Sequence, residues 1–303
     1  MRGGVLPIVI VHRNQPARCV GTVAAFRDQG VPVHIVVVDS GSEPAAVAQL
    51  RSAFAGVQDV ELALLEHNVG FGPGANAGLR RALAGEGDWI AVAPHDSVPA
   101  PGCLAGLLEA VAVLPRAGRA CADVGDDATP MVDRYLGGLV SPARVAAGWE
   151  PAAYPHGTLM LARRACLEEV GLFDERYFAY CEEADLGLRA RRGGWEVGVV
   201  RGADVRNGAL STASATVDYL QQRNTLLLVR THFGRYPAMV RLALGLAALA
   251  RGLVHPPSRP LVFVPRARLR GMADHLRGRY GPPPDQLQDR RFSGLWLRGR
   301  RRG

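Results

Sequence analysis

Three carboxylates stand within four residues of the segment YCEEADLGLR, at Glu182, Glu183 and Asp185. Neighbouring carboxylates repel one another, which raises the pKa of at least one of them and suits it to remove a proton as a general base. The same acids would also be favourable as solvated side chains at a helix N-terminus, where the helix dipole attracts negative charge. Aromatic residues precede them at positions 173, 177, 178 and 180, so we expect the acids to lie against a packed surface.

Two further aspartates each follow an apolar run. Asp39 ends the run VHIVVVD and precedes Ser-Gly-Ser. Its carboxylate could accept hydrogen bonds from a nucleobase or a ribose, or it could cap the next turn. Asp96 stands in the segment APHDS. A carboxylate there could hold a divalent cation against a diphosphate, or it could be an ordinary turn residue. The residues alone leave both pairs of alternatives open.

A glycine-rich segment, HNVGFGPGANAG, runs from His67 to Gly78. Glycines allow tight turns and let the backbone approach a ligand closely. Residues 72–77 fit a dinucleotide-binding pattern, G-x-G-x-x-A, with Asp96 as the distant acid. However, the pattern follows the third apolar run instead of opening the first strand–helix–strand unit, and it contains Pro73. A glycine-rich turn before a helix is the better interpretation.

Four apolar runs rich in β-branched residues alternate with helix-like stretches in the first hundred residues. We expect strands at 5–11, 33–39, 60–66 and 88–94, and helices at 17–29, 45–54 and 76–84. Near-continuous apolar strands separated by helices are typical of a parallel sheet buried on both faces, so the predicted fold is an α/β doubly wound sheet. Ligands of such sheets bind beyond the carboxyl ends of the strands, which is where Asp39, Asn68, His95 and Asp96 stand.

The remainder of the chain is less regular. We expect helices at 163–170, 182–192 and 217–232, a strand at 194–200, and an apolar helix from Pro237 that Arg241 and Arg251 interrupt. That last helix is short of a clean membrane span. Arg223 could place its guanidinium on a phosphate or simply face solvent from its helix. The last fifty residues, rich in Pro, Gly and Arg, are expected to be partly loose.

Composition and charge exclude several classes of protein. The 303 residues are 48% hydrophobic and 21% charged, which is typical of a globular protein and not of a disordered or collagen-like chain. The net charge is +8, but residues 237–303 hold 14 Arg and 3 Asp, so the rest of the chain is mildly acidic. Because the basic charge is confined to one terminal segment and no zinc-finger or RNA-binding motif occurs, we expect no nucleic-acid partner.

Five scattered cysteines without a C-x-x-C pair predict a reducing cytosol and no disulfide framework or zinc site. The first residues have too short an apolar run for a signal peptide.

Six motifs occur in an order that resembles one known family. They are DSGS at 39–42, HNVGFGPGANAG at 67–78, the strand-ending Asp96, HGTLMLARR at 156–164, GLFDERYFAYCEEADLGLR at 171–189 and YLQQRN at 219–224. Together they resemble the family 2 glycosyltransferases, in the rhamnosyltransferase and galactofuranosyltransferase-like branch, over residues 5–235. The resemblance implies a GT-A-type, mostly parallel sheet with a helical C-terminal extension.

The resemblance also implies a reaction and a set of site residues. The reaction would be an inverting transfer of a sugar from a dTDP-, UDP- or GDP-linked donor to an acceptor hydroxyl. Glu183 matches the catalytic base, with Glu182 and Asp185 beside it, and Asp96 matches the last Asp of the family's D-x-D motif. The expected donor-binding residues are Val11, His12, Asp39, Asn68, Gly70, Gly72, Asn76, His95, Asp96, Arg206 and Arg223. The expected acceptor-binding residues are His156, Gly157 and Thr158.

Two departures from the family pattern concern a metal ion. Pro94 replaces the first Asp of D-x-D, and Asn207 replaces a later histidine that joins the metal. Asp96 with Asn207 would be a poor set of ligands for a divalent cation. We therefore expect weak or absent dependence on Mg²⁺ or Mn²⁺, with Arg206 or Arg223 taking over the charge of the leaving group.

The expected organisation is a nucleotide-sugar-binding half at 1–120, an acceptor-binding and catalytic half of the same domain at 121–235, and an Arg-rich helical tail at 236–303. We expect a cytoplasmic enzyme whose acceptor is a glycan, a lipid or a small molecule. The apolar helix and the arginines of the tail could make a peripheral contact with the inner face of a membrane, or the helix could pack on the catalytic body.

Two other functions remain open at the level of sequence. One is a degenerate protein that binds a nucleotide sugar without turnover, which the departures at Pro94 and Asn207 motivate. The other is a nucleotidyltransferase built on a similar sheet. The second would require a basic residue in a glycine-rich loop after the first strand, where the chain offers only Arg13 and no glycine.

Overall fold

The computed structural model describes residues 4–208 and 214–288. Contacts within the chain group these residues into two compact units. The first unit, here called the sheet unit, comprises residues 4–132, 138–178 and 182–208, and the second, here called the helical unit, comprises 133–137, 179–181 and the described residues from 214 onward. The division into functional segments at residues 120 and 235 stays a prediction.

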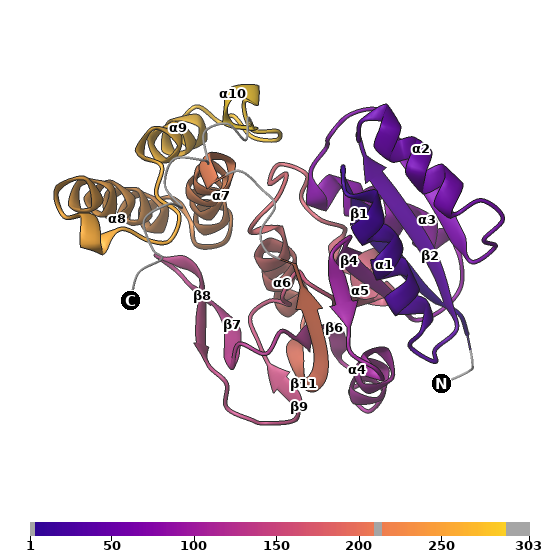
Figure 1. The fold of residues 1–303 in the computed structure, drawn as a ribbon. Helices are drawn as coiled ribbons and strands as arrows, with labels where there is room; N and C mark the ends of the chain where they lie inside the picture. The colour runs from indigo at the N-terminus through magenta and orange to yellow at the C-terminus, as the bar shows by residue number, and fades with distance from the viewer. Residues whose placement is uncertain (1–3, 209–213, 289–303) are drawn as a thin grey trace, which may run out of the picture. The chain divides into compact units, whose positions relative to one another are not determined.

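The sheet unit is built on a nine-stranded sheet in which the strand order is β3-β2-β1-β4-β10-β6-β11-β5, with β9 pairing β11 (Figure 1). Strand β1 pairs in parallel with β2 and β4, β2 with β3, and β6 with β11. Strand β10 is antiparallel to β4 and β6, and β5 and β9 are antiparallel to β11. The strands span Leu6–His12 (β1), Val33–Ser40 (β2), Val60–Leu65 (β3), Trp89–Pro94 (β4), Ser97–Pro99 (β5), Ala117–Asp123 (β6), Gly148–Pro151 (β9), Met160–Arg163 (β10) and Glu196–Asn207 (β11).

Helices cover both faces of this sheet, which explains why its central strands are apolar without alternation. Residues of α1, α2 and α4, among them Phe26, Leu50 and Leu107, pack on one face, whereas α3, α5 and α6 supply Leu79, Leu167 and Leu186 to the other. The helices span Pro16–Arg27 (α1), Pro44–Ala53 (α2), Phe71–Ala84 (α3), Cys103–Ala112 (α4), Arg164–Val170 (α5) and Glu182–Arg192 (α6). The predicted mostly parallel, doubly wound sheet is confirmed.

Residues 71–78 of the glycine-rich segment form the first turns of α3, and residues 67–70 form the loop before it. The predicted helix start at Asn76 was therefore five residues late, since α3 begins at Phe71. The reason is packing: a methyl group on Gly78 would overlap the side chain of Val9, and one on Gly74 would lie 3.0 Å from Cγ1 of Val11. Glycine here lets the helix approach β1 closely, although it lowers intrinsic helix propensity.

The segment between residues 97 and 163 contains strands that the sequence did not predict. Besides β5, β6, β9 and β10, two strands, β7 (Ala128–Asp133) and β8 (Gly137–Pro142), pair with each other in a separate sheet. These strands are short and contain Gly, Ala, Arg and Pro, so they lack the apolar runs that mark β1 and β2.

The helical unit contains α7 (Ser214–Phe233), α8 (Arg235–Val254), a short 3-10 helix η1 (Pro256–Ser258), α9 (Pro265–Leu276) and α10 (Asp285–Gln288). α9 lies in the segment expected to be partly loose. It is ordered by a buried ion pair, in which Nη2 of Arg268 lies 2.9 Å from Oδ1 of Asp218 on α7. Tyr219 on α7 also donates a hydrogen bond to Asp274 on α9.

Candidate functional site

The ends of β1 and β2 carry a buried pair, His12 and Asp39, which are directly paired in the sheet. Nδ1 of His12 lies 2.8 Å from Oδ2 of Asp39, while Nε2 accepts a hydrogen bond from the backbone N–H of Gln15 at 3.0 Å. Because Nε2 is an acceptor, the ring holds its proton on Nδ1 and donates it to Asp39.

Asp39 also accepts hydrogen bonds from the backbone and hydroxyl of Ser42. Burial alone would raise the pKa of Asp39, but the hydrogen bonds from His12 and Ser42 outweigh it and hold the pKa below its ordinary value. Both side chains are 1% exposed or less. In this structure His12 and Asp39 face inward and order the two loops that follow β1 and β2. Their contact with the donor stays a prediction.

The next strand end continues this arrangement. Oδ1 of Asn68 accepts hydrogen bonds from the Ser40 hydroxyl at 3.3 Å and from the backbone of Gly70 at 3.1 Å. Gly70 has a φ of +90°, a conformation that favours glycine, and it lies against Phe178. Asn68 and Gly70 thus shape the loop before α3, where the sequence placed the donor.

Asn76 makes its hydrogen bonds within the sheet unit. Its side chain is buried and exchanges hydrogen bonds with the backbone of Phe173, at 2.9 and 3.0 Å, and it also bonds Glu175. This amide joins α3 to the loop before α6, and its contact with the donor stays a prediction. Gly72 lies close to Glu182, since a methyl group on Gly72 would be 3.6 Å from Cγ of Glu182.

The end of β4 brings together the residues expected to hold a metal. Ser97, which follows Asp96, pairs with Asn207 across β5 and β11, so Asp96 and Asn207 are neighbours at one edge of the sheet. Arg206 is exposed on β11 and pairs with Val98. The backbone of His95 bonds Val11 at 3.0 Å. Burial and the nearby His12 lower the pKa of His95, which favours its neutral form.

Arg18 is a cation at this edge that the sequence analysis missed. It is exposed on α1, and a methyl on Gly208 would lie 2.7 Å from its Nη1 and 3.5 Å from Oδ2 of Asp96. The only available sign in the sequence was its place one turn into a helix that follows β1, which does not distinguish it from other arginines.

The side chains at this edge of the sheet are a poor set of ligands for a divalent cation. Among residues 4–208 and 214–288, no three His, Cys, Asp or Glu side chains are grouped so that they could hold a metal ion. Asp96 offers one carboxylate and Asn207 one amide, whereas Mg²⁺ is normally bound by carboxylates with several further oxygens.

The two adjacent glutamates at the start of α6 point to different neighbours. Glu182 is buried toward the start of α3, and its Oε2 has no hydrogen-bond partner among the described residues. Burial, and then repulsion from Glu183, raises the pKa of Glu182 well above its ordinary value. Burial also raises the pKa of Glu183, against hydrogen bonding from the backbone and the charge of Arg119. A carboxylate with a raised pKa is a stronger base once it is ionised.

Glu183 lies against the segment predicted to bind the acceptor. Gly157 is so close to Oε1 of Glu183 that a methyl group there would overlap it. His156 accepts a hydrogen bond from the backbone of Thr158 and lies 2.9 Å from its hydroxyl, and the Ser97 hydroxyl donates to the carbonyl of Thr158. Burial lowers the pKa of His156. These contacts connect the segment against Glu183 to β5, the strand that follows Asp96.

Arg119 on β6 is a buried cation whose charge acts on Glu183. Its side chain is fully buried, and its Nε and Nη1 have no hydrogen-bond partner within the described part of the chain. Burial lowers its pKa to about 10. An unpaired buried charge is costly unless an opposite charge compensates it. Glu183 can supply that opposite charge, because the charge of Arg119 lowers the pKa of the Glu183 carboxyl group.

Two expected site residues, Asp185 and Arg223, make their contacts inside the protein. Asp185 is buried and binds Arg189 at 2.9 Å, one helical turn away, and Arg189 in turn donates to the backbone of Leu172. Arg223 is fully buried in the helical unit, where it donates to Asn224 and to the carbonyl of Gly281. Both side chains are engaged inside the protein. The catalytic role of Asp185 and the phosphate contact of Arg223 stay predictions.

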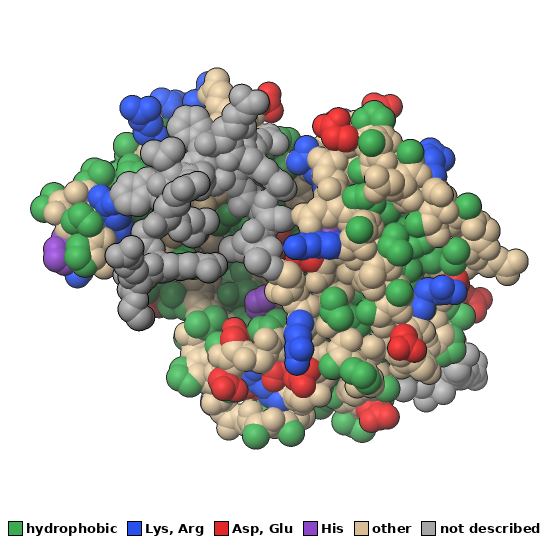
Figure 2. All heavy atoms as spheres, viewed as in Figure 1, with side chains coloured by type: hydrophobic (Ala, Val, Ile, Leu, Met, Phe, Trp, Pro, Cys, Tyr) green, Lys and Arg blue, Asp and Glu red, His purple; other side chains and the backbone are tan. Residues whose placement is uncertain are grey.

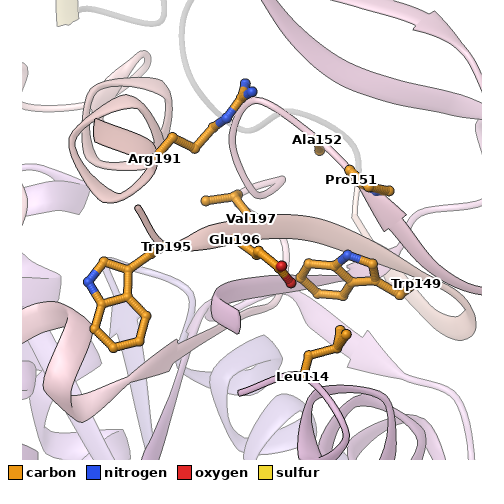
Figure 3. A pocket seen from close by; sticks show the side chains of 8 residues that line it. All are labelled: Leu114, Trp149, Pro151, Ala152, Arg191, Trp195, Glu196 and Val197. Carbon is orange, nitrogen blue, oxygen red and sulfur yellow. The ribbon is translucent and has the colours of Figure 1, made fainter. Parts of the chain in front are cut away.

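A pocket of about 420 Å³ lies elsewhere, at the first residues of β11 (Figure 3). Figure 3 shows Trp149 and Trp195 on opposite sides of it, with Glu196 between them in this view. None of the predicted site residues lines this pocket, and those that lie on or just after strands are at the far ends of β1, β2, β4 and β11.

The sequence matches a family model and two curated relatives. The family described as Glycosyl transferase family 2 matches residues 8–171. The N-acetylglucosaminyl-diphospho-decaprenol L-rhamnosyltransferase of two Mycobacterium tuberculosis strains is 28% identical over 248 residues, which cover 70% of this chain and 80% of the relative.

Solved structures show the same fold. The mannosyltransferase PcManGT from Pyrobaculum calidifontis, in complex with GDP-Man and Mn²⁺, has a TM-score of 0.59 at 14% identity, covering 89% of this chain and 86% of that one. GalNAc-T7 with UDP, GalNAc and Mn²⁺ has a TM-score of 0.65 at 15% identity, covering 90% and 54%. S. aureus TarS 1-349 in complex with UDP-GlcNAc has a TM-score of 0.53 at 13% identity, covering 94% and 83%. The mostly parallel sheet with flanking helices is the GT-A fold.

Proposed function

The chain belongs to glycosyl transferase family 2 and is a glycosyltransferase, and on this premise we propose that it transfers a sugar from a nucleoside-diphosphate donor to an acceptor hydroxyl with inversion. The relative from M. tuberculosis is a rhamnosyltransferase that acts on a diphospho-decaprenol acceptor by its name, which supports a deoxyhexose donor and a lipid-linked acceptor for this chain. The proposed location is cytoplasmic, at the inner face of a membrane.

In the proposed reaction, the acceptor oxygen attacks the anomeric carbon from the face opposite the diphosphate. The bond between that carbon and the phosphate oxygen breaks, and the nucleoside diphosphate leaves with the electron pair. Glu183 takes the proton of the acceptor hydroxyl, which contributes about 10²–10⁴-fold to the rate. One observation carries this assignment: the Glu183 carboxylate lies against Gly157, in a segment that Ser97 ties to the strand after Asp96.

The leaving diphosphate needs positive charge near it. We assign this role to Arg18, with Arg206 as the second candidate, because both are exposed at the edge that carries Asp96. Charged groups aimed at the site where negative charge develops stabilise a transition state. Two of the structural neighbours were solved with Mn²⁺, but the ligand set of this chain is poor, so we propose weak or absent dependence on a divalent cation.

A transfer assay tests the proposal. The full chain is incubated with dTDP-rhamnose, UDP-sugars or GDP-sugars and a short polyprenyl-diphosphate-linked N-acetylglucosamine, and products are identified by mass spectrometry. The anomeric configuration of the new bond is read by NMR. An inverted product from one donor is the expected result. Retained configuration would contradict the role of Glu183, and tight nucleotide binding without product from any donor would contradict turnover on this acceptor.

A further inference from the structure

Helix α8 packs into the helical unit through a narrow face. Its buried residues are Pro237, Ala238, Gly245, Leu249 and Gly252. They recur at intervals of seven, four and three residues, which places them on one side of the helix. A methyl group on Gly245 would lie 2.7 Å from Cε of Met272 on α9, so the two helices are closely packed at this point.

The other sides of α8 are apolar and exposed. Of the residues that the structure describes, α8 is the one helix long and apolar enough to cross a membrane, yet only 28% of its most apolar window is buried in the protein. The exposed large side chains include Tyr236, Met239, Leu246, Leu253 and Val254, and the helix contains no carboxylate. In Figure 2, green side chains are visible over α8 at the left edge of the view. A contiguous exposed apolar face of this kind marks an interaction surface.

The charge around this face indicates the chemistry of its partner. Residues 214–288 contain eleven arginines, three aspartates and no glutamate. Arg235 and Arg251 are exposed on α8 itself, near its two ends. An apolar helix face flanked by arginines complements a surface with an apolar interior and anionic head groups, which is an anionic lipid bilayer.

A membrane span is less compatible with these contacts than a helix lying on the membrane. If α8 crossed the bilayer as a single span, its close contact with Met272 would be lost and Arg241, in mid-helix, would enter the hydrocarbon. If α8 lies in the head-group layer, the buried face keeps its packing and only the apolar face enters the lipid.

We propose that α8 docks this protein on an anionic membrane, with Tyr236, Met239, Leu246 and Leu253 inserted among the lipid chains and Arg235 and Arg251 at the phosphates. The inference rests on the proposed function only for the role of the docking, which is to bring the enzyme to a lipid-linked acceptor. The docking itself needs neither donor nor acceptor.

Vesicle flotation of the full chain tests this inference. Vesicles of phosphatidylcholine alone are compared with vesicles that also contain phosphatidylglycerol. We expect wild type to float with the anionic vesicles, and the double variant Met239→Glu with Leu246→Glu to bind about a hundredfold more weakly, because two apolar side chains are replaced by anions. Val113→Glu is the matched control, since Val113 is 78% exposed in the sheet unit, and it should float like wild type.

Further measurements keep the inference falsifiable if the double variant unfolds, which its circular dichroism would reveal. Arg251→Gln should weaken binding roughly fivefold, and raised salt should weaken binding of wild type. Failure of wild type to float, or flotation of the folded double variant at the wild-type level, would overturn the inference. If wild type does not bind vesicles but forms a dimer in sedimentation velocity, and the double variant is a monomer, the face instead contacts a second copy of the chain. None of these outcomes depends on sugar transfer.

Discussion

The contact between Gly157 and Glu183 makes a single methyl group an informative perturbation. In Gly157→Ala the new methyl would overlap Oε1 of Glu183, whose Cγ and Cδ lie 3.5 and 3.4 Å from the same point. Only the end of the carboxylate is too close, and it belongs to a flexible side chain. The variant should therefore fold with nearly unchanged stability while the carboxylate turns away from its position.

The magnitude follows from the size of that displacement. Methyl and oxygen atoms need ordinary van der Waals separation, so Oε1 must move by about 1 Å. A misplacement of about 1 Å in a catalytic group costs about 10²-fold in rate. We therefore expect kcat of Gly157→Ala to fall about 10²-fold, whereas the affinity for the nucleotide should be unchanged because the strand ends near Asp96 are not altered.

The assay measures kcat by product formation, nucleotide affinity by calorimetry and stability by thermal unfolding. Gly21→Ala on α1 is the matched control, because a methyl there meets nothing within 4 Å. It should match wild type in all three measurements. If Gly157→Ala keeps kcat within about threefold of wild type while Gly21→Ala does the same, the contact does not position the base and the reasoning is refuted.

Three further predictions follow from the same site. Because burial raises the pKa of Glu183, kcat/KM should rise with pH through an inflection above the ordinary carboxyl range, and an inflection within that range would contradict the buried base. The pKa of Glu182 is also raised in the folded protein, so the folded state retains a proton that the unfolded chain releases. The free energy of unfolding should therefore fall as pH rises above the ordinary carboxyl pKa. Glu182→Gln should remove part of that slope, which thermal unfolding at a series of pH values measures. Arg18→Gln should lower kcat about tenfold or more while EDTA changes wild type little, and strict loss of wild-type activity in EDTA would show that a metal carries the charge of the leaving group.

The central strands could be predicted because their environment is uniform. Ile8, Val9 and Ile10 are buried on both faces of the sheet, so β1 is apolar without interruption and its run is visible in the sequence. β6 is equally central, yet Arg119 stands in its middle. Its burial depends on tertiary neighbours such as Met160 and Phe173, which no local pattern contains.

The site was predictable as a set of loops more than as a set of side-chain roles. A parallel sheet brings the carboxyl ends of its strands to one edge, and Asp96 and Asn207 lie at such an edge in the structure. That they and the segment against Glu183 form the site stays a prediction. Which polar side chains are consumed inside the protein could not be predicted. Asp185 and Arg223 look like site residues in sequence, but their partners, Arg189 and Gly281 among them, become visible only in the folded chain.

The central claim is that Glu183 is the base in an inverting sugar transfer. The most direct measurement compares wild type with Glu183→Gln, which keeps the size of the side chain and removes its basicity. With the donor and acceptor that support turnover, kcat should fall about 10²–10⁴-fold while nucleotide affinity is retained. A Glu183→Gln enzyme that transfers the sugar at the wild-type rate would contradict the account.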